Sequence, residues 1–160
     1  MGFIFRVPAT PVSMGKGYFG GGSSGLGRVI DIDGIQFDTE AAINPAAGLS
    51  STRSQLAGVN SSTRGYFGGG YTGAAVSSEI DGIQFDTEAA INPTAVLSVA
   101  RFALVGVNSS TRGYFGGGHL GASYSSEIDG IQFDTEAAIN PTAALSVDRT
   151  NLAGVQSGSL

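Results

Sequence analysis

The hexapeptide GYFGGG occurs three times, at residues 17–22, 65–70 and 113–118. Successive copies are 48 residues apart, and they divide the chain after residues 1–16 into three units: residues 17–64, 65–112 and 113–160. Two aromatic residues followed by three glycines favour a strand that ends in a turn, because a helix interior does not accommodate such a glycine run well. A repeat of this length predicts an array of similar small units.

A second constant block, IDGIQFDTEAAINP, occurs once in each unit, at residues 32–45, 80–93 and 128–141. Apolar and polar residues alternate over residues 83–86, which predicts a half-buried strand with Asp86 and Glu88 on its polar face. The Asp-Gly pair before this strand indicates either a two-residue hairpin or a bulge that turns Ile80 and Ile83 to the same side.

Further strands are predicted elsewhere in the unit. The apolar stretch FALVGV, residues 102–107, has strand character. The residues that follow each Asn-Pro pair, such as TAVLSVAR at 94–101, predict either a strand or a single helical turn. The segment between Phe85 and Pro93 is too short for a stable helix. The sequence therefore predicts an all-β fold with three or four short strands per unit.

The composition argues against several classes of function. The chain has 160 residues, no cysteine and a single histidine, His119, so disulfides, Cys-His catalysis and multi-histidine metal sites are excluded. Its 13 acidic and 8 basic residues give a net charge of −5, and binding to nucleic acid is not expected. No apolar run reaches the roughly 18 residues that a membrane span needs, and no secretory signal is predicted. We therefore expect a soluble protein.

Catalysis is also not predicted. A Ser-His-Asp triad would depend on His119, and no G-x-S-x-G motif is present. Carboxylate pairs such as Asp86 and Glu88 recur in every unit, which is typical of solvated or arginine-paired repeat features rather than of one active site. We expect no enzymatic activity, no cofactor and no bound metal.

Three stretches of the unit carry a family resemblance: ARFALVGV at 100–107, RGYFGGG at 112–118 and IDGIQFD at 128–134. They resemble a blade of the kelch β-propellers, in which an apolar strand follows an arginine, the next strand ends in glycines and a third carries a Tyr-Asp-like step. The resemblance covers residues 17–160 and implies one blade of about 48 residues per unit. Tandem YFGGG repeats are also similar to those of bacteriophage tail and virion proteins.

The arginine of the blade pattern falls at Arg53, Arg101 and Arg149. Because these arginines recur with the unit, we expect them to bind backbone carbonyls or a repeated acid such as Asp86 and so to connect adjacent blades. A ligand-binding arginine is more often present once.

Three blades do not close a ring, because propellers contain about four to eight. The resemblance therefore implies a homodimer that closes a six-bladed ring. Residues 151–155, NLAGV, have the pattern of the strand that precedes GYFGGG, and we expect them to pair with residues 17–22 of the other subunit. The residues predicted at this inter-subunit closure are Gly17, Tyr18, Phe19, Leu152 and Val155. A competing arrangement places residues 8–12 of the same chain there, although two prolines disfavour it.

Residues 1–16 have no counterpart in the repeats. Their apolar side chains, Phe3, Ile4, Phe5 and Val7, predict either an arm that docks on another protein or a disordered terminus.

The units differ mainly in the loop that follows the glycines, at residues 23–30, 71–78 and 119–126. A constant scaffold with one variable loop is typical of a recognition surface, and neutral drift at exposed positions is the alternative. The candidate contacts for a sugar ligand are Tyr71, Thr72, His119 and Tyr124.

Two functions follow from these observations. The first is a structural or assembly protein, most simply a bacteriophage virion or tail component that binds copies of itself and other virion proteins. The alternative is a lectin-like propeller that binds glycans for adhesion to a cell surface. The sequence favours the first, because the units are nearly identical and the apolar segment at residues 3–7 is the one without a repeat counterpart.

Overall fold

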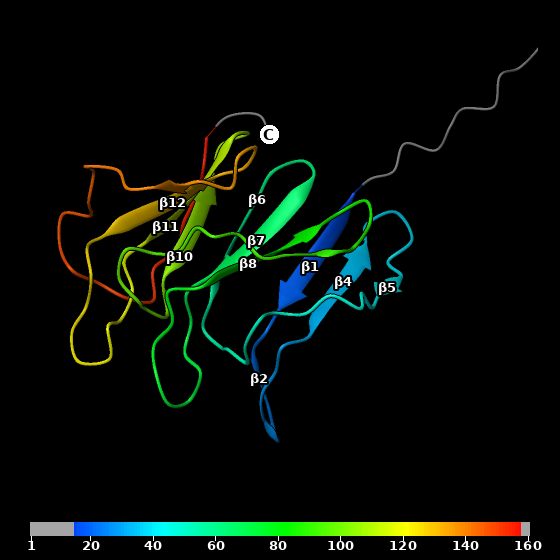
Figure 1. Cartoon of the computed structure of the whole chain (residues 1–160), viewed down its shortest axis with the longest axis horizontal. Coiled ribbons are helices and arrows are strands. Elements are labelled where there is room, and N and C mark those ends of the chain that lie inside the picture. The colour runs from blue at the N-terminus through cyan, green and yellow to red at the C-terminus, as the bar shows by residue number, and fades with distance from the viewer. Residues whose placement is uncertain (1–14, 158–160) are drawn as a thin grey trace, which may run out of the picture.

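The computed structural model describes residues 15–157, and all of their regular structure is β. Three antiparallel sheets follow one another along the chain and lie side by side (Figure 1). The predicted all-β class is confirmed. None of the described residues forms a helix that is long and apolar enough to cross a membrane.

The strands are short, and each sheet is built in the same order. The first sheet contains β1 (Lys16–Gly20), β4 (Ile32–Gln36) and β5 (Ala42–Ile43), and β2 (Ser23–Ser24) and β3 (Gly27–Arg28) form a separate hairpin. The second sheet contains β6 (Ala57–Asn60), β7 (Arg64–Gly68), β8 (Ile80–Gln84) and β9 (Ala90–Ile91). The third contains β10 (Val105–Asn108), β11 (Arg112–Gly116), β12 (Ile128–Gln132) and β13 (Ala138–Ile139).

The second and third sheets each take their first strand from the preceding sequence unit. β6 lies within residues 17–64 but pairs with β7 of the next unit, and β10 pairs with β11 in the same way. Within residues 15–157 no equivalent strand precedes β1, so the first sheet has three strands and β1 lies at its edge. The sheets are therefore offset from the sequence repeat by one strand.

The Asp-Gly pairs are part of regular strands. In β8, Asp81 lies opposite Phe67 and Gly82 lies opposite Tyr66 in an uninterrupted antiparallel register. The hairpin interpretation is therefore wrong, and the register contains no bulge. Ile80 and Ile83 are both buried although they point to opposite faces, because neighbouring sheets cover both faces of the second sheet.

Several predicted strand boundaries are also wrong. β8 ends at Gln84, and residues 85–87 form a turn, so Asp86 and Glu88 do not share a strand face. Residues 94–101 form neither a strand nor a helical turn and make one isolated bridge, from Val96 to Glu79. The strand predicted at 102–107 begins only at Val105, and residues 151–155 form no strand in the single chain.

The apolar core consists of one cluster for each contact between sheets. Ile32, Leu49, Phe67 and Ile83 lie between the first and second sheets. A larger cluster between the second and third sheets includes Tyr66, Phe115 and Ile131, all of which are fully buried. Burial of this kind contributes roughly 1.5–3 kcal/mol per large apolar side chain. The faces of the sheets, rather than one central core, therefore hold the fold together.

The glycine run is explained by close packing and by backbone conformation. The ring of Phe115 covers Gly68, and a Cβ added to this glycine would lie 2.8 Å from the ring. Gly69 has φ +70°, and a Cβ there would lie 2.5 Å from the carbonyl oxygen of Arg101. Side chains other than hydrogen are excluded at both positions, so the run lets the strand pass beneath a ring and then turn sharply.

Candidate functional site

The faces between successive sheets carry the most regular chemistry of the molecule. We call the contact between the first and second sheets the first junction and that between the second and third sheets the second junction. Each junction contains a buried ion pair between an arginine and an aspartate, a tyrosine-carboxylate cluster, and a phenylalanine ring that packs on a glycine. The same contacts therefore appear twice, one repeat apart.

The first contact is a buried arginine. Arg53 donates to the backbone carbonyl of Gly69 at 2.7 Å and forms an ion pair with Asp81. In the second junction Arg101 binds Asp129 at 2.6 Å, and the side chains of both arginines are fully buried. Burial lowers the pKa of Arg53, and the neighbouring carboxylates oppose this effect. The prediction that these arginines bind carbonyls and an acid across the sheets is confirmed for these two.

The acid differs from the one suggested by the sequence. Asp81, rather than Asp86, accepts the hydrogen bond from Arg53, because Asp81 lies within β8 and faces the preceding sheet. Asp86 lies in the turn after β8, where its carboxylate accepts a hydrogen bond from the backbone N–H of Thr87.

The second contact is a cluster around a glutamate. Lys16 binds Glu88 at 2.6 Å, the hydroxyl of Tyr18 lies 3.3 Å from the same carboxylate, and the Tyr18 ring stacks on Phe85 at 5.3 Å. The second junction repeats this arrangement with Arg64, Tyr66, Glu136 and Phe133. Burial raises the pKa of Tyr66. Each cluster joins β1, or its repeat equivalent β7, to the turn between the last two strands of the next sheet.

The Lys16–Glu88 pair predicts a pH dependence. The hydrogen bond from Lys16 lowers the pKa of Glu88 from its usual 4.5. A lowered pKa in the folded state contributes stability that is present above the unfolded pKa and is lost as the pH falls through the folded value. We therefore expect Glu88→Gln to lower the melting temperature at pH 7, and we expect this effect to shrink as the pH falls below 4.5. Glu127→Gln, at an exposed glutamate directly before β12, is the control, and an equal effect of Glu88→Gln at both ends of this pH range would contradict the prediction.

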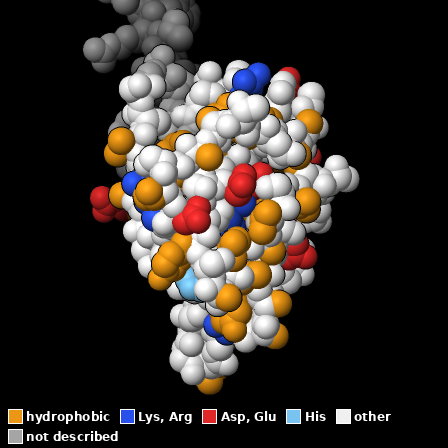
Figure 2. All heavy atoms as spheres, turned by 90° about the vertical axis from the view of Figure 1, so that its left-hand side faces the viewer, with side chains coloured by type: hydrophobic (Ala, Val, Ile, Leu, Met, Phe, Trp, Pro, Cys, Tyr) orange, Lys and Arg blue, Asp and Glu red, His pale blue; other side chains and the backbone are white. Residues whose placement is uncertain are grey.

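The second sheet covers one face of the third sheet, and no sheet of the described residues covers the other, which we call its open face. This open face carries one half of the contacts that make up a junction. Arg112 and Arg149 are exposed, although their repeat equivalents are paired with carboxylates. A Cβ added to Gly116 would approach only the side chain of Ile128, at 3.8 Å, whereas the equivalent Gly68 is covered by the ring of Phe115. Figure 2 views the molecule from this side and shows hydrophobic side chains gathered on the face, with charged side chains among them.

The open face of the first sheet presents the other half. Phe19 is 69% exposed, whereas its equivalent Phe115 is fully buried. Asp33 and Glu40 are exposed and correspond to Asp129 and Glu136, the acids of the second junction. Every group missing from one open face is therefore present on the other.

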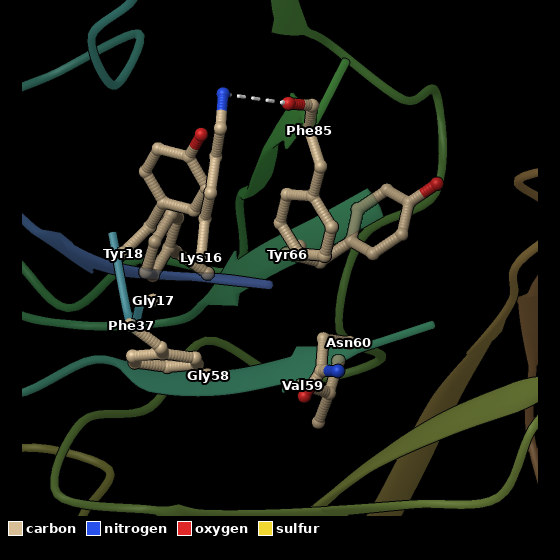
Figure 3. A pocket seen from close by; sticks show the side chains of 11 residues that line it. Lys16, Gly17, Tyr18, Phe37, Gly58, Val59, Asn60, Tyr66 and Phe85 are labelled. Carbon is tan, nitrogen blue, oxygen red and sulfur yellow. Dashed lines mark hydrogen bonds between the residues drawn. The ribbon is translucent and has the colours of Figure 1, made fainter. Parts of the chain in front are cut away.

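A groove lies between β1 and β6, where a first strand of the first sheet belongs. Its volume is about 360 Å³, and it is lined by residues of β1, β6 and β7 together with Phe37 and Phe85. Figure 3 shows Lys16, Tyr18 and Phe85 along one side of the groove and Val59 and Asn60 along the other. The position of this groove relative to β1 matches the position of β6 relative to β7.

The predicted sugar-binding residues are brought together in a row of rings. Tyr71 lies 5.5 Å from Phe102, Phe102 lies 4.8 Å from His119, and His119 lies 5.2 Å from Tyr124. Tyr124 is 51% exposed, and Thr72 instead binds Ala75 within its own loop. Phe102 was missing from the predicted set, although it lies in a second stretch that varies between units, at residues 98–103.

The residues predicted at the inter-subunit closure lie at the two ends of the sheet array. Gly17, Tyr18 and Phe19 are in β1, and Leu152 and Val155 lie beyond the third sheet. The sequence analysis did not identify Asp33 and Glu40 as candidate interface residues. Their role is suggested only by the ion pairs Arg101–Asp129 and Arg64–Glu136, in which their repeat equivalents take part. The predicted docking residues Phe3, Ile4, Phe5 and Val7 lie outside the described residues.

Comparisons with known proteins supply no family. No protein-family model matches the chain, and a search of curated proteins finds no match. Over residues 15–157, no group of three or more histidine, aspartate and glutamate side chains is placed to hold a metal ion. The two open faces and the groove are thus the features from which a function can be argued.

Proposed function

We propose that this chain is a non-enzymatic structural protein that assembles with copies of itself into a closed β-propeller. Each four-stranded sheet acts as one blade, and two chains of three blades make a six-bladed ring. The proposal includes a place in a bacteriophage virion or tail, where residues 1–16 dock on other virion proteins. This last part rests on the resemblance of the YFGGG repeats to those of phage proteins.

The observation that carries the proposal is the complementarity of the two open faces. The third sheet offers Arg112, Arg149 and a Gly116 on which no ring packs in the described residues, and the first sheet offers carboxylates and the exposed ring of Phe19. Within residues 15–157 the outer edge of β1 has no strand partner, which is a further reason, because exposed edges pair readily with other chains. Head-to-tail contacts of this type form rings where the rotation closes.

The solution mass of the purified chain tests this function. Light scattering behind a sizing column is expected to give twice the 16.1 kDa of one chain. A monomer at every concentration would contradict self-assembly, and a series of larger species would show an open polymer in place of a closed ring.

The row of rings favours a carbohydrate-binding propeller as a second candidate. Aromatic rings stack on the apolar faces of sugars, and Tyr71, His119 and Tyr124 come from equivalent loops of different repeats. Binding to a glycan array that is lost on Tyr71→Ala and Tyr124→Ala would support this candidate. Such binding is compatible with assembly, because the rings lie outside the two junctions.

A further inference from the structure

We propose that self-assembly occurs by strand insertion: residues 153–156 of one chain enter the groove beside β1 of a second copy, and Arg149 of the first chain binds Asp33 of the second. This inference rests on the proposed self-assembly and specifies its interface. The occupant of the groove is a second copy of this chain, and the contact is head to tail.

The register of the inserted strand follows from the two sheets that are complete. β10 pairs with β11 so that Val105 faces Gly116 and Val107 faces Tyr114, and β6 pairs with β7 in the same way. One repeat further along the chain, Ala153 takes the position of Val105 and Val155 that of Val107. Their partners in the second copy are Gly20 and Tyr18 of β1.

The segment that inserts already lies against β10, although it forms no strand in the single chain. A Cβ added to Gly154 would lie 2.9 Å from the carbonyl oxygen of Gly106, so this segment packs closely on β10. Asn108 donates its backbone N–H to the side chain of Gln156 at 3.0 Å. Val155 remains 94% exposed. The segment therefore stacks on β10 as β10 stacks on β6, and only its neighbour in the sheet plane is absent.

The groove has the dimensions and chemistry of a strand site. It runs along the edge of β1 that faces away from β4, and on this side the N–H and C=O groups of β1 have no strand partner within residues 15–157. Addition of a strand to such an edge supplies main-chain hydrogen bonds and lets alternate side chains enter pockets. The occupied equivalents of this site, beside β7 and β11, are filled by β6 and β10.

The arginine on the open face is held in position before its partner arrives. The carbonyl of Arg149 accepts a hydrogen bond from the N–H of Gly118 at 2.9 Å. The carbonyls of Arg53 and Arg101 make the same bond, at 2.8 and 2.9 Å, in the loops that send their side chains to the next sheet. The Arg149 side chain is therefore presented where a fourth sheet would receive it, and the first sheet of a second copy supplies Asp33 at the matching position.

Two further contacts are expected if the open faces of two copies meet as the second and third sheets do in the second junction. Phe19 of the second copy covers Gly116, as Phe115 covers Gly68. Arg112 binds Glu40 of the second copy, as Arg64 binds Glu136. The interface thus joins opposite charges around a buried ring, and this arrangement rejects the reversed orientation of the two faces.

Charge exchange tests the arginine contact. We expect Arg149→Glu and Asp33→Arg each to weaken assembly by about a hundredfold or more, because like charges then meet at the interface. An equimolar mixture of the two variants is expected to assemble like the wild type, since in a two-chain ring one interface is native and the other has its charges reversed. Asp86→Arg, an exposed acid of the second sheet that lies on neither open face, is the control and is expected to assemble normally. Sedimentation velocity measures all four samples, and circular dichroism confirms that each is folded.

The possible outcomes distinguish an error in the proposed interface from an error in the proposed self-assembly. A wild-type chain that stays monomeric overturns both the proposed function and this inference. A wild type that assembles, together with single variants that assemble equally well, overturns the arginine contact and leaves self-assembly standing. Loss of assembly in the single variants without recovery in the mixture also overturns the contact.

An engineered disulfide tests the inserted strand directly. The chain has no cysteine, so Tyr18→Cys combined with Val155→Cys introduces one pair that the proposed register places opposite each other. We expect oxidation to join separate chains covalently. The control pair, Tyr18→Cys with Gln156→Cys, is shifted by one residue, keeps Phe19 in place and is expected to remain mostly reduced. Equal cross-linking of both pairs, or none in an assembled wild-type-like sample, overturns the strand insertion and points to residues 1–14 as the occupant of the groove.

Discussion

Replacement of Arg101 by alanine is expected to lower the free energy of unfolding by about 3–5 kcal/mol, because it leaves the carboxylate of Asp129 buried without its partner. Both side chains are almost completely inaccessible to solvent, and Arg101 also donates to the carbonyl of Phe115 at 3.0 Å. Removal of the guanidinium therefore breaks an ion pair and a backbone hydrogen bond in the same junction. Urea unfolding followed by circular dichroism measures the loss.

The repeat supplies a matched control for this variant. Arg149 occupies the same position one unit later but is exposed and has no carboxylate partner in the described part of the chain. Arg149→Ala is expected to leave the unfolding free energy of the single chain unchanged within about 0.5 kcal/mol. Unfolding at several protein concentrations removes the contribution of assembly, which depends on concentration. A similar loss for both variants would show that the buried ion pair is not the cause.

Replacement of Phe115 by alanine is expected to cost about 3–5 kcal/mol, the usual result of removing a buried aromatic ring. Phe115 is fully buried, belongs to the larger core cluster and covers Gly68. Alanine leaves a cavity that the neighbouring strands fill poorly, because main chain forms the floor of the site. The same urea unfolding measures the change.

Phe19 provides the comparison, since the same side chain at the same repeat position is 69% exposed. Phe19→Ala is expected to change the stability of the single chain by no more than about 0.5 kcal/mol. Its effect is expected on assembly, where the ring covers Gly116 of a second copy. A large loss in the monomer would contradict this, because it would place Phe19 in an intrachain core.

The repeat, the all-β class and the role of the glycine run were predictable from local sequence. Aromatic residues followed by glycines define strands that end in sharp turns, and Gly69 with φ +70° has that conformation. The recurrence of an arginine in every unit correctly indicated a structural role, because Arg53 and Arg101 both bind across sheets. These features depend on neighbours in sequence or on the repeat itself.

The predicted ends of the strand around residues 80–86 are wrong for a physical reason. Alternation analysis assumes that one face of a strand is covered, but the second sheet packs on both faces, so Ile80 and Ile83 are buried on opposite sides. Both isoleucines are therefore buried without the hairpin or bulge that the sequence suggests. The strand then ends at Gln84, and the acids that follow lie in a turn rather than on a polar face.

The sequence by itself determined the unit and its number of copies, because these depend on local propensity and on repetition. Only the tertiary structure decided which carboxylate each arginine meets, since Arg53 and Asp81 are 28 residues apart and come together through stacking of sheets. Burial in a stacked array is set by the next copy of the unit, so identical residues such as Phe19 and Phe115 differ only in whether a neighbouring sheet is present.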